Sequence, residues 1–266
     1  MNRLLFTEGM AERLIMKPFN GTFFLMLGIM ILILIGLTLL FRKKSLRTRQ
    51  IALTAIYIFG LVVFVVYKMF LSRDTAYSEI CAAAGKGAFS WWLELPLQLC
   101  NINLLMIPVA ALTMKRPLLS FAFFVAPLGA GFALAMPGIG FEEYSLLLPR
   151  IFFYYLTHFM VFLGGPALAC FGLYKPRFKD TVPTALMLLA VTFCIFLINE
   201  LIIVTGANRY ANYFFTMNTE GNAILDLCWA LIPVPFLYEI PLVLILLPFI
   251  LIVTAGFWVA EKLKKK

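Results

Sequence analysis

The chain has 266 residues, of which 63% are hydrophobic and 13% are charged, and its mean hydropathy is +0.97. A soluble domain carries about 25% charged residues, so this composition excludes a soluble protein and indicates one that crosses a membrane several times. Lys and Arg outnumber Asp and Glu by 22 to 13, and in a membrane protein the location of such charges reports topology.

The first twenty residues mix charged and apolar side chains. We expect residues 1–20 to form an amphipathic helix that lies at the membrane surface. The apolar run that follows is too long for a signal peptide, and no small-residue cleavage site closes it. Residues 21–260 are expected to form a single domain of seven transmembrane helices, and residues 261–266 a basic cytoplasmic tail.

Each expected span is an apolar run of about 20 residues or more between charged or turn-forming residues. The runs are residues 21–41, 50–72, 93–113, 118–136, 151–174, 182–204 and 228–258. Apart from Lys68, which lies within the second span, fourteen Lys and Arg residues then fall on one side of the membrane and seven on the other. This bias predicts a cytoplasmic C-terminus and an external N-terminus. The fold class is therefore all-α, a polytopic helical bundle.

Cysteine and histidine usage gives no sign of a metal site. The five cysteines are scattered without any CxxC spacing, and His158 is the only histidine. We expect neither a disulfide framework nor a metal, and the sequence holds no nucleotide or flavin motif that would indicate a cofactor.

Polar side chains converge on the outer half of the predicted bundle. Cys100 lies seven residues past the start of the third span, and His158 lies seven past the start of the fifth. Both spans run inward, so both side chains are expected about 10 Å below the outer boundary. Glu200 is close to the outer end of the sixth span, and Glu239 lies in the outer half of the seventh. Ionisable groups at such depth commonly face a protein interior or a wet cavity.

These residues also allow simpler interpretations. A lone buried His is commonly a hydrogen-bonded structural residue, and a lone membrane Cys is commonly inert. Glu94 and Glu200 lie near span ends, and with Lys68 they are expected to reach toward interfacial water. Glu239 is deeper and is expected to be paired or protonated.

Five short segments follow one another along the chain: Glu94-Leu-Pro-Leu-Gln-Leu-Cys100, Tyr155-Leu-Thr-His158, Asn212-Tyr213-Phe, Leu225-Asp226 and Pro233-Val-Pro235. Together they resemble the YwaF-type family of bacterial integral membrane proteins, over roughly residues 20–258. That family is similar to the eukaryotic transmembrane protein 164, described as a lipid acyltransferase with a conserved Cys and His as its catalytic pair. The resemblance implies that Cys100 and His158 form this pair. This chain differs from the family pattern at Gln98 and in the aliphatic residues around its Pro-x-Pro element.

In the implied reaction a fatty acyl chain moves between membrane lipids through a Cys100 thioester, and His158 serves as general base and acid. An oxyanion donor is also needed. Asn103, three residues after Cys100 on a neighbouring helix face, is preferred, with Gln98 and Asn101 as alternatives. Glu94 could orient a neighbouring polar group.

At the outer mouth, Arg209, Asn212 and Asp226 could bind a lipid headgroup, or they could form an ordinary solvated loop. The expected partners are phospholipids or glycolipids, with no nucleic acid, and the oligomeric state is open. We expect a multi-pass protein of the bacterial cytoplasmic membrane, with its active site toward the outer leaflet.

Three other functions stay open at this point. A lipid hydrolase would use the same two residues with water as acceptor. A transporter or solute-binding component would suit the proline-broken fourth and seventh spans and the buried Glu239 and Lys68. A non-catalytic scaffold would use the cysteine only for packing.

Overall fold

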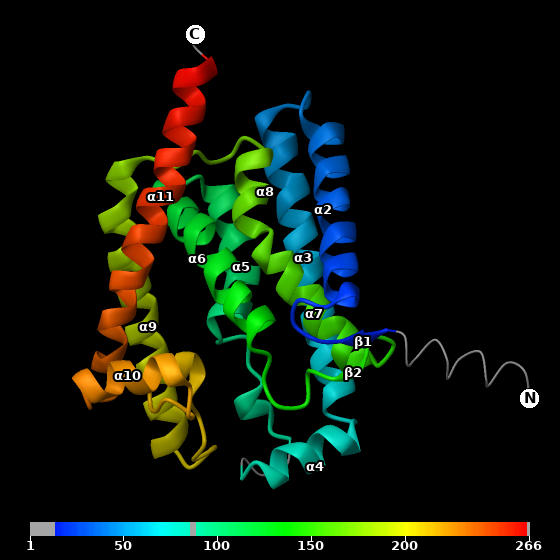
Figure 1. Ribbon diagram of the computed structural model, residues 1–266, viewed down its shortest axis with the longest axis vertical. Coiled ribbons are helices and arrows are strands. Elements are labelled where there is room, and N and C mark those ends of the chain that lie inside the picture. The colour runs from blue at the N-terminus through cyan, green and yellow to red at the C-terminus, as the bar shows by residue number, and fades with distance from the viewer. Residues whose placement is uncertain (1–13, 86–88, 265–266) are drawn as a thin grey trace, which may run out of the picture.

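The computed structural model describes residues 14–85 and 89–264, which form a bundle of helices with almost no strand (Figure 1). The predicted polytopic helical bundle is therefore confirmed. The helices are α2 (Gly21–Phe41), α3 (Leu46–Leu71), α4 (Thr75–Ala83), α5 (Leu99–Thr113), α6 (Arg116–Ala135), α7 (Pro149–Phe162), α8 (Gly164–Cys170), α9 (Thr181–Val204), α10 (Ala223–Leu231) and α11 (Ile240–Lys264). Short 3₁₀ turns lie at Trp91–Leu93, Phe178–Asp180, Tyr213–Phe215 and Leu237–Glu239.

Among the described residues, five helical segments are long and apolar enough to cross a membrane. They are α2, α3, α6, α9 with the turn before it, and α11 with the turn before it. Helices α7 and α8 make a sixth candidate, bent by 44° at the break between them, and the apolar α5 is shorter. The predicted seven crossings and their orientation stay predictions.

The bundle has two ends, which carry different loops (Figure 1). Segments 42–45, 114–115 and 171–180 lie at one end together with the last turns of α11, and we call this the C-terminal end. Helices α4 and α10 lie across the other end, which we call the α10 end.

Several of the helices begin at a polar residue that caps the first turn. The Asn20 side chain accepts a hydrogen bond from the Phe23 amide at the start of α2, and Ser45 accepts from Thr48 at the start of α3.

The core lies between α3, α5, α6 and α7 and is filled by fully buried side chains such as Leu104, Phe124, Tyr155 and Phe159. Helix α8 approaches α6 very closely because Gly165 has no side chain. A Cβ atom there would lie 2.2 Å from the Phe123 carbonyl oxygen.

The larger differences from the predicted segments lie at residues 93–98, at residues 232–239 and at the end of α11. The third span was expected from residue 93, but α5 begins at Leu99, since Pro96 cannot donate a helical hydrogen bond and disfavours helix in the residue before it. The expected seventh span is divided into α10 and α11 by a turn that contains Pro233 and Pro235. Helix α11 also continues through Glu261 to Lys264, where a separate tail was expected.

The predicted amphipathic helix over residues 1–20 is not seen in its described part, and residues 1–13 lie outside the described residues. Ile15–Met16 forms strand β1, which pairs antiparallel with β2 (Tyr144–Ser145). Met16 is fully buried, so this segment packs against the bundle through its own side chains and backbone.

Candidate active site

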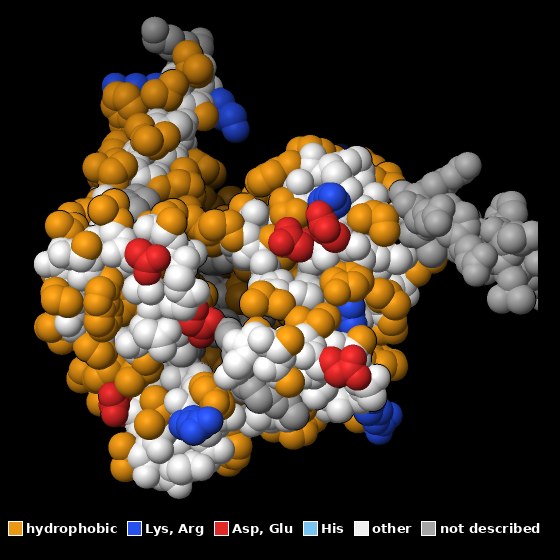
Figure 2. Space-filling model, turned by 60° about the horizontal axis from the view of Figure 1, so that its bottom comes forward, with side chains coloured by type: hydrophobic (Ala, Val, Ile, Leu, Met, Phe, Trp, Pro, Cys, Tyr) orange, Lys and Arg blue, Asp and Glu red, His pale blue; other side chains and the backbone are white. Residues whose placement is uncertain are grey.

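A cavity of about 460 Å³ lies toward the α10 end of the bundle, between residues of α3, α5, α6, α7, α9 and α11. Figure 2, which faces this end, shows a hollow near its centre. Most of the cavity wall is apolar, but a group of polar side chains also lines the cavity. These polar residues are Lys68, Gln98, Cys100, Asn101, His158, Thr192, Asn222 and Glu239.

Cys100 is the second residue of α5 and is 8% exposed. The amide N–H groups in the first turn of a helix have no partner within the helix, and the helix dipole places partial positive charge there. Gln98, the N-cap residue, does not cap this turn with its side chain, because its Oε1 accepts a hydrogen bond of 3.0 Å from the Phe214 amide. The thiol therefore lies where negative charge on sulfur, or on an oxygen next to it, is favoured.

His158 lies in α7, buried at 5% exposure, and faces the same cavity. Its Nδ1 atom is 2.7 Å from the carbonyl oxygen of Tyr154. A carbonyl can only accept, so Nδ1 carries the proton and the neutral ring presents Nε2 as a proton acceptor. The Tyr154 ring packs against the imidazole with centroids 4.1 Å apart.

The structure thus brings Cys100 and His158 to one cavity from two different helices. Among the contacts of the described residues, no hydrogen bond joins the two side chains. Catalytic hydrogen bonds are often long or absent before substrate binds, so this geometry is compatible with proton transfer once a ligand fills the cavity.

Lys68 and Glu94 form a salt bridge beside the cavity, and their side chains are only 10% and 14% exposed. The expectation that both reach toward interfacial water is wrong, because each finds its partner within the protein. The Tyr77 hydroxyl donates to the other Glu94 oxygen at 3.2 Å. Burial, together with the Glu94 carboxylate, raises the pKa of Tyr77, so this hydroxyl keeps the proton that it donates.

Tyr213 fixes the segment that leads into α5. Its hydroxyl donates to the Trp92 carbonyl at 2.9 Å and accepts from the Leu95 amide at 2.8 Å. Asn199 holds Tyr213 in turn, by bonds of 3.0 Å to its amide and 2.8 Å to its carbonyl. The Asn-Tyr element therefore positions the first turn of α5, and with it Cys100.

Glu239 is 8% exposed and lines the cavity from the turn before α11. Its Oε1 atom is buried without a hydrogen-bond partner among the described residues. Burying a polar atom unpaired costs about 1–3 kcal/mol, so this carboxyl group is a costly feature that a bound hydroxyl or amine would satisfy.

Other predicted residues lie elsewhere. The Asn103 side-chain amide donates to the Leu99 carbonyl at 2.7 Å, and Asn103 does not line the cavity, whereas Asn101 does. Glu94 lies behind Lys68 and does not line it either, and Glu200 is also outside its lining.

The three predicted headgroup ligands make contacts within or near their own loop. Asn212 bonds the backbone of Met217 and Asn218, and Asp226 accepts from Thr219 at 2.5 Å. Arg209 contacts Tyr210. None of the three lines the cavity.

Among the cavity residues that were not predicted from the sequence are two tyrosines, Tyr67 and Tyr154. Tyr154 lies one helical turn before His158, so helical spacing alone could have indicated it. Tyr67 carried no such signal. Across the described residues, no group of three or more His, Cys, Asp or Glu side chains could hold a metal ion.

Comparison with known proteins identifies a family. A model described as the TMEM164 family matches residues 17–259, nearly the whole chain. No curated protein and no solved structure matches significantly.

Proposed function

We propose that this chain, which belongs to the TMEM164 family, is a membrane lipid acyltransferase that carries the acyl group on Cys100. Family membership agrees with the resemblance read from the sequence. The observation that carries the proposal is the single cavity that both Cys100 and His158 line. It offers a nucleophile, a base and an apolar wall together, as acyl transfer between lipids requires.

In the first half-reaction the Cys100 thiol gives its proton to Nε2 of His158, and the sulfur attacks the ester carbonyl of a phospholipid. A tetrahedral oxyanion forms and collapses, the C–O ester bond breaks, and the lysolipid leaves with the proton from Nε2. The product on the protein is a Cys100 thioester, and His158 is neutral again.

The second half-reaction reverses these roles. An acceptor hydroxyl gives its proton to Nε2 and attacks the thioester carbonyl. The C–S bond breaks and the Cys100 sulfur takes the proton back from His158. The Nδ1 hydrogen bond to Tyr154 keeps the ring in the tautomer that both steps use.

The oxyanion would be stabilised by the free amide N–H groups in the first turn of α5, with the Asn101 side chain close by. This replaces the role first given to Asn103, whose amide is held by the Leu99 carbonyl. Backbone donors need no reorganisation when charge develops, which suits a buried site.

The wall of the cavity suits an acyl chain at one side and a polar headgroup region at the other. Apolar side chains of α6, α9 and α11 would contact the chain, and Lys68 and Glu239 would contact the polar part of donor or acceptor. The apolar side chains include Val125, Leu128, Phe132, Leu188, Leu242 and Leu246. With the N-terminus outside, this cavity would open toward the outer leaflet of the cell membrane.

Trapping of the acyl-enzyme tests the proposal. Purified protein in vesicles of phospholipid with a labelled acyl chain should acquire label that hydroxylamine releases and that mass spectrometry assigns to Cys100. Cys100→Ser should abolish this thioester, whereas Cys228→Ser, a buried cysteine outside the cavity, should retain it. Full acyl transfer by Cys100→Ala would overturn the mechanism. Free fatty acid without an acylated acceptor would indicate a hydrolase.

A further inference from the structure

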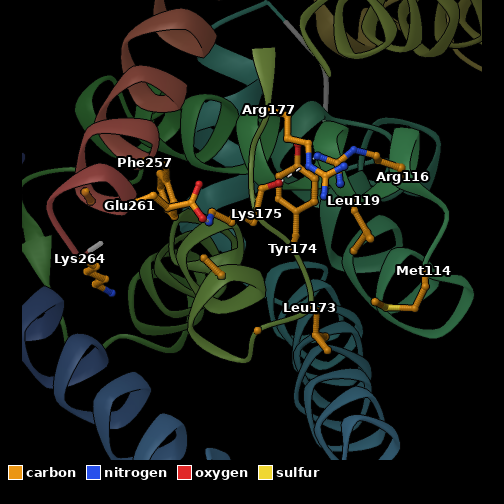
Figure 3. Close-up of a pocket in the computed structure, with 13 residues that line it drawn as sticks. Met114, Arg116, Leu119, Leu173, Tyr174, Lys175, Arg177, Phe257, Glu261 and Lys264 are labelled. Carbon is orange, nitrogen blue, oxygen red and sulfur yellow. Dashed lines mark hydrogen bonds and ion pairs between the residues drawn. The ribbon is translucent and has the colours of Figure 1, made fainter. Parts of the chain in front are cut away.

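A second cavity, of about 650 Å³, lies at the C-terminal end of the bundle, away from Cys100 and His158. It lies between the start of α6, the segment 172–177 that follows α8, and the last turns of α11. Figure 3 shows Arg116 and Leu119 on one side of it and Phe257, Glu261 and Lys264 of α11 on the other.

One wall of this cavity is held by a dense polar network around Asp180. Arg116 binds both Asp180 oxygens, at 2.7 and 2.6 Å, and also the Lys175 carbonyl at 3.0 Å. The Tyr174 hydroxyl and the Arg177 amide add bonds of 2.7 and 2.9 Å to the same carboxylate. The segment 174–177 is thereby fixed, and the charge of Arg116 is neutralised by Asp180.

The charges that line the cavity do not balance. Of the four lining cations, Arg116 is paired with Asp180 and Lys175 with Glu261. The side chains of Arg177 and Lys264 form no ion pair among the described residues, and Glu261 is the only acidic residue in the lining. Two positive charges, one from each side of the cavity, are therefore left to meet an anion.

The rest of the lining is apolar. Leu119, Leu173 and Phe257 face the same space, with Met114 at its edge. A soluble anion would gain nothing from these side chains, whereas a molecule with a charged head and an apolar body would contact both parts of the wall. The position at the end of membrane-spanning helices places the charged part at the level of lipid headgroups.

We propose that this cavity binds the phosphate headgroup of an anionic membrane phospholipid. Arg177 and Lys264 hold the phosphate, and the acyl chains run along Leu119 and Phe257. The phosphate chemistry is shared with soluble phosphate esters, but only a lipid uses the apolar wall. The inference does not depend on the proposed acyl transfer, because none of its residues lines the cavity of Cys100.

Native mass spectrometry of the full chain, released from detergent with added lipid, tests this site. The test variant is Arg177→Gln/Lys264→Gln. The control is Lys43→Gln/Lys44→Gln, which removes the same charge from exposed lysines at the same end of the bundle, outside the cavity. The probes are phosphatidylglycerol, zwitterionic phosphatidylcholine and chain-free glycerol phosphate.

We expect wild type and the Lys43/Lys44 variant to retain phosphatidylglycerol equally, and the Arg177/Lys264 variant to bind it about tenfold or more weakly, because two charged hydrogen bonds are lost. Phosphatidylcholine should bind weakly to all three proteins. Equal retention of phosphatidylglycerol by all three would overturn the site. Glycerol phosphate binding as tightly as the lipid would overturn the lipid as its occupant.

Discussion

Nδ1 of His158 lies 2.7 Å from the carbonyl oxygen of Tyr154, one helical turn earlier in α7. The bond leaves Nε2 as the proton acceptor of a residue that lines the cavity. Since His158 is the only histidine of the chain, its ring nitrogens can be observed without interference in untagged, ¹⁵N-labelled protein. We expect nitrogen NMR at pH 7 to show a neutral ring with the proton on Nδ1. A ring protonated at Nε2 alone would contradict the proposed base.

Removal of the base should affect the rate far more than the fold. His158→Gln keeps a polar side chain but cannot take up a proton, so acyl transfer in vesicles should fall by about 10²–10⁴-fold. Tyr154→Phe is the matched control, because it keeps the carbonyl that orients His158 and removes the hydroxyl that donates to the Ala133 carbonyl. An His158→Gln variant as active as this control would remove His158 from the mechanism.

Removing one partner of the buried Lys68–Glu94 pair should lower the unfolding free energy, because the other charge is then left unpaired. Lys68→Met leaves a largely buried carboxylate without its cation, and we expect a loss of about 3–5 kcal/mol in unfolding free energy. Thermal unfolding in detergent micelles measures the change. Lys68→Met/Glu94→Gln, which removes both charges, should recover most of the loss. Equal destabilisation of the single and double variants would show that the pairing is not the cause.

We expect Glu239 to lower the stability of the fold and to take part in acyl transfer. Its Oε1 is buried without a hydrogen-bond partner among residues 14–85 and 89–264. Glu239→Leu should therefore raise the midpoint of thermal unfolding, by an amount that corresponds to about 1–3 kcal/mol of unfolding free energy. If the carboxyl group contacts the acceptor, the same variant should transfer acyl groups more slowly. A lower unfolding midpoint would indicate that Glu239 has a stabilising partner, and unchanged transfer would exclude contact with the acceptor.

The close approach of α8 to α6 depends on the absence of a side chain at Gly165. Gly165→Ala would place a Cβ 2.2 Å from the Phe123 carbonyl oxygen, so the two helices must separate, at a cost of about 1–3 kcal/mol. Gly131→Ala is the control, because its Cβ would meet the Phe162 ring at an ordinary 3.5 Å. Thermal unfolding should distinguish the two. If both variants unfold alike, the α6–α8 contact is more adaptable than the structure indicates.

Hydropathy located the spans well where helices are continuous. The predicted segment 21–41 coincides with α2, and 182–204 differs from α9 by one residue. The prediction was poorer at residues 93–113 and 228–258, because a window of mean hydropathy averages over Pro96, Pro233 and Pro235 and does not register the backbone they interrupt. Cys100 consequently lies at the start of a helix rather than seven residues into one.

The sequence alone determined that the chain is a membrane protein built as a bundle of helices, because the free energy of transferring each segment into lipid depends on local composition. It also indicated Cys100 and His158, through their positions in apolar segments and through the family resemblance. Only the tertiary structure decided which polar groups meet. Lys68 pairs with Glu94, the Asn103 amide donates to its own helix, and Oε1 of Glu239 is buried without a hydrogen-bond partner in the described part of the chain. Such polar partners can be distant in sequence, and the packing of the helices brings them together. The composition of a single segment does not report how that segment packs.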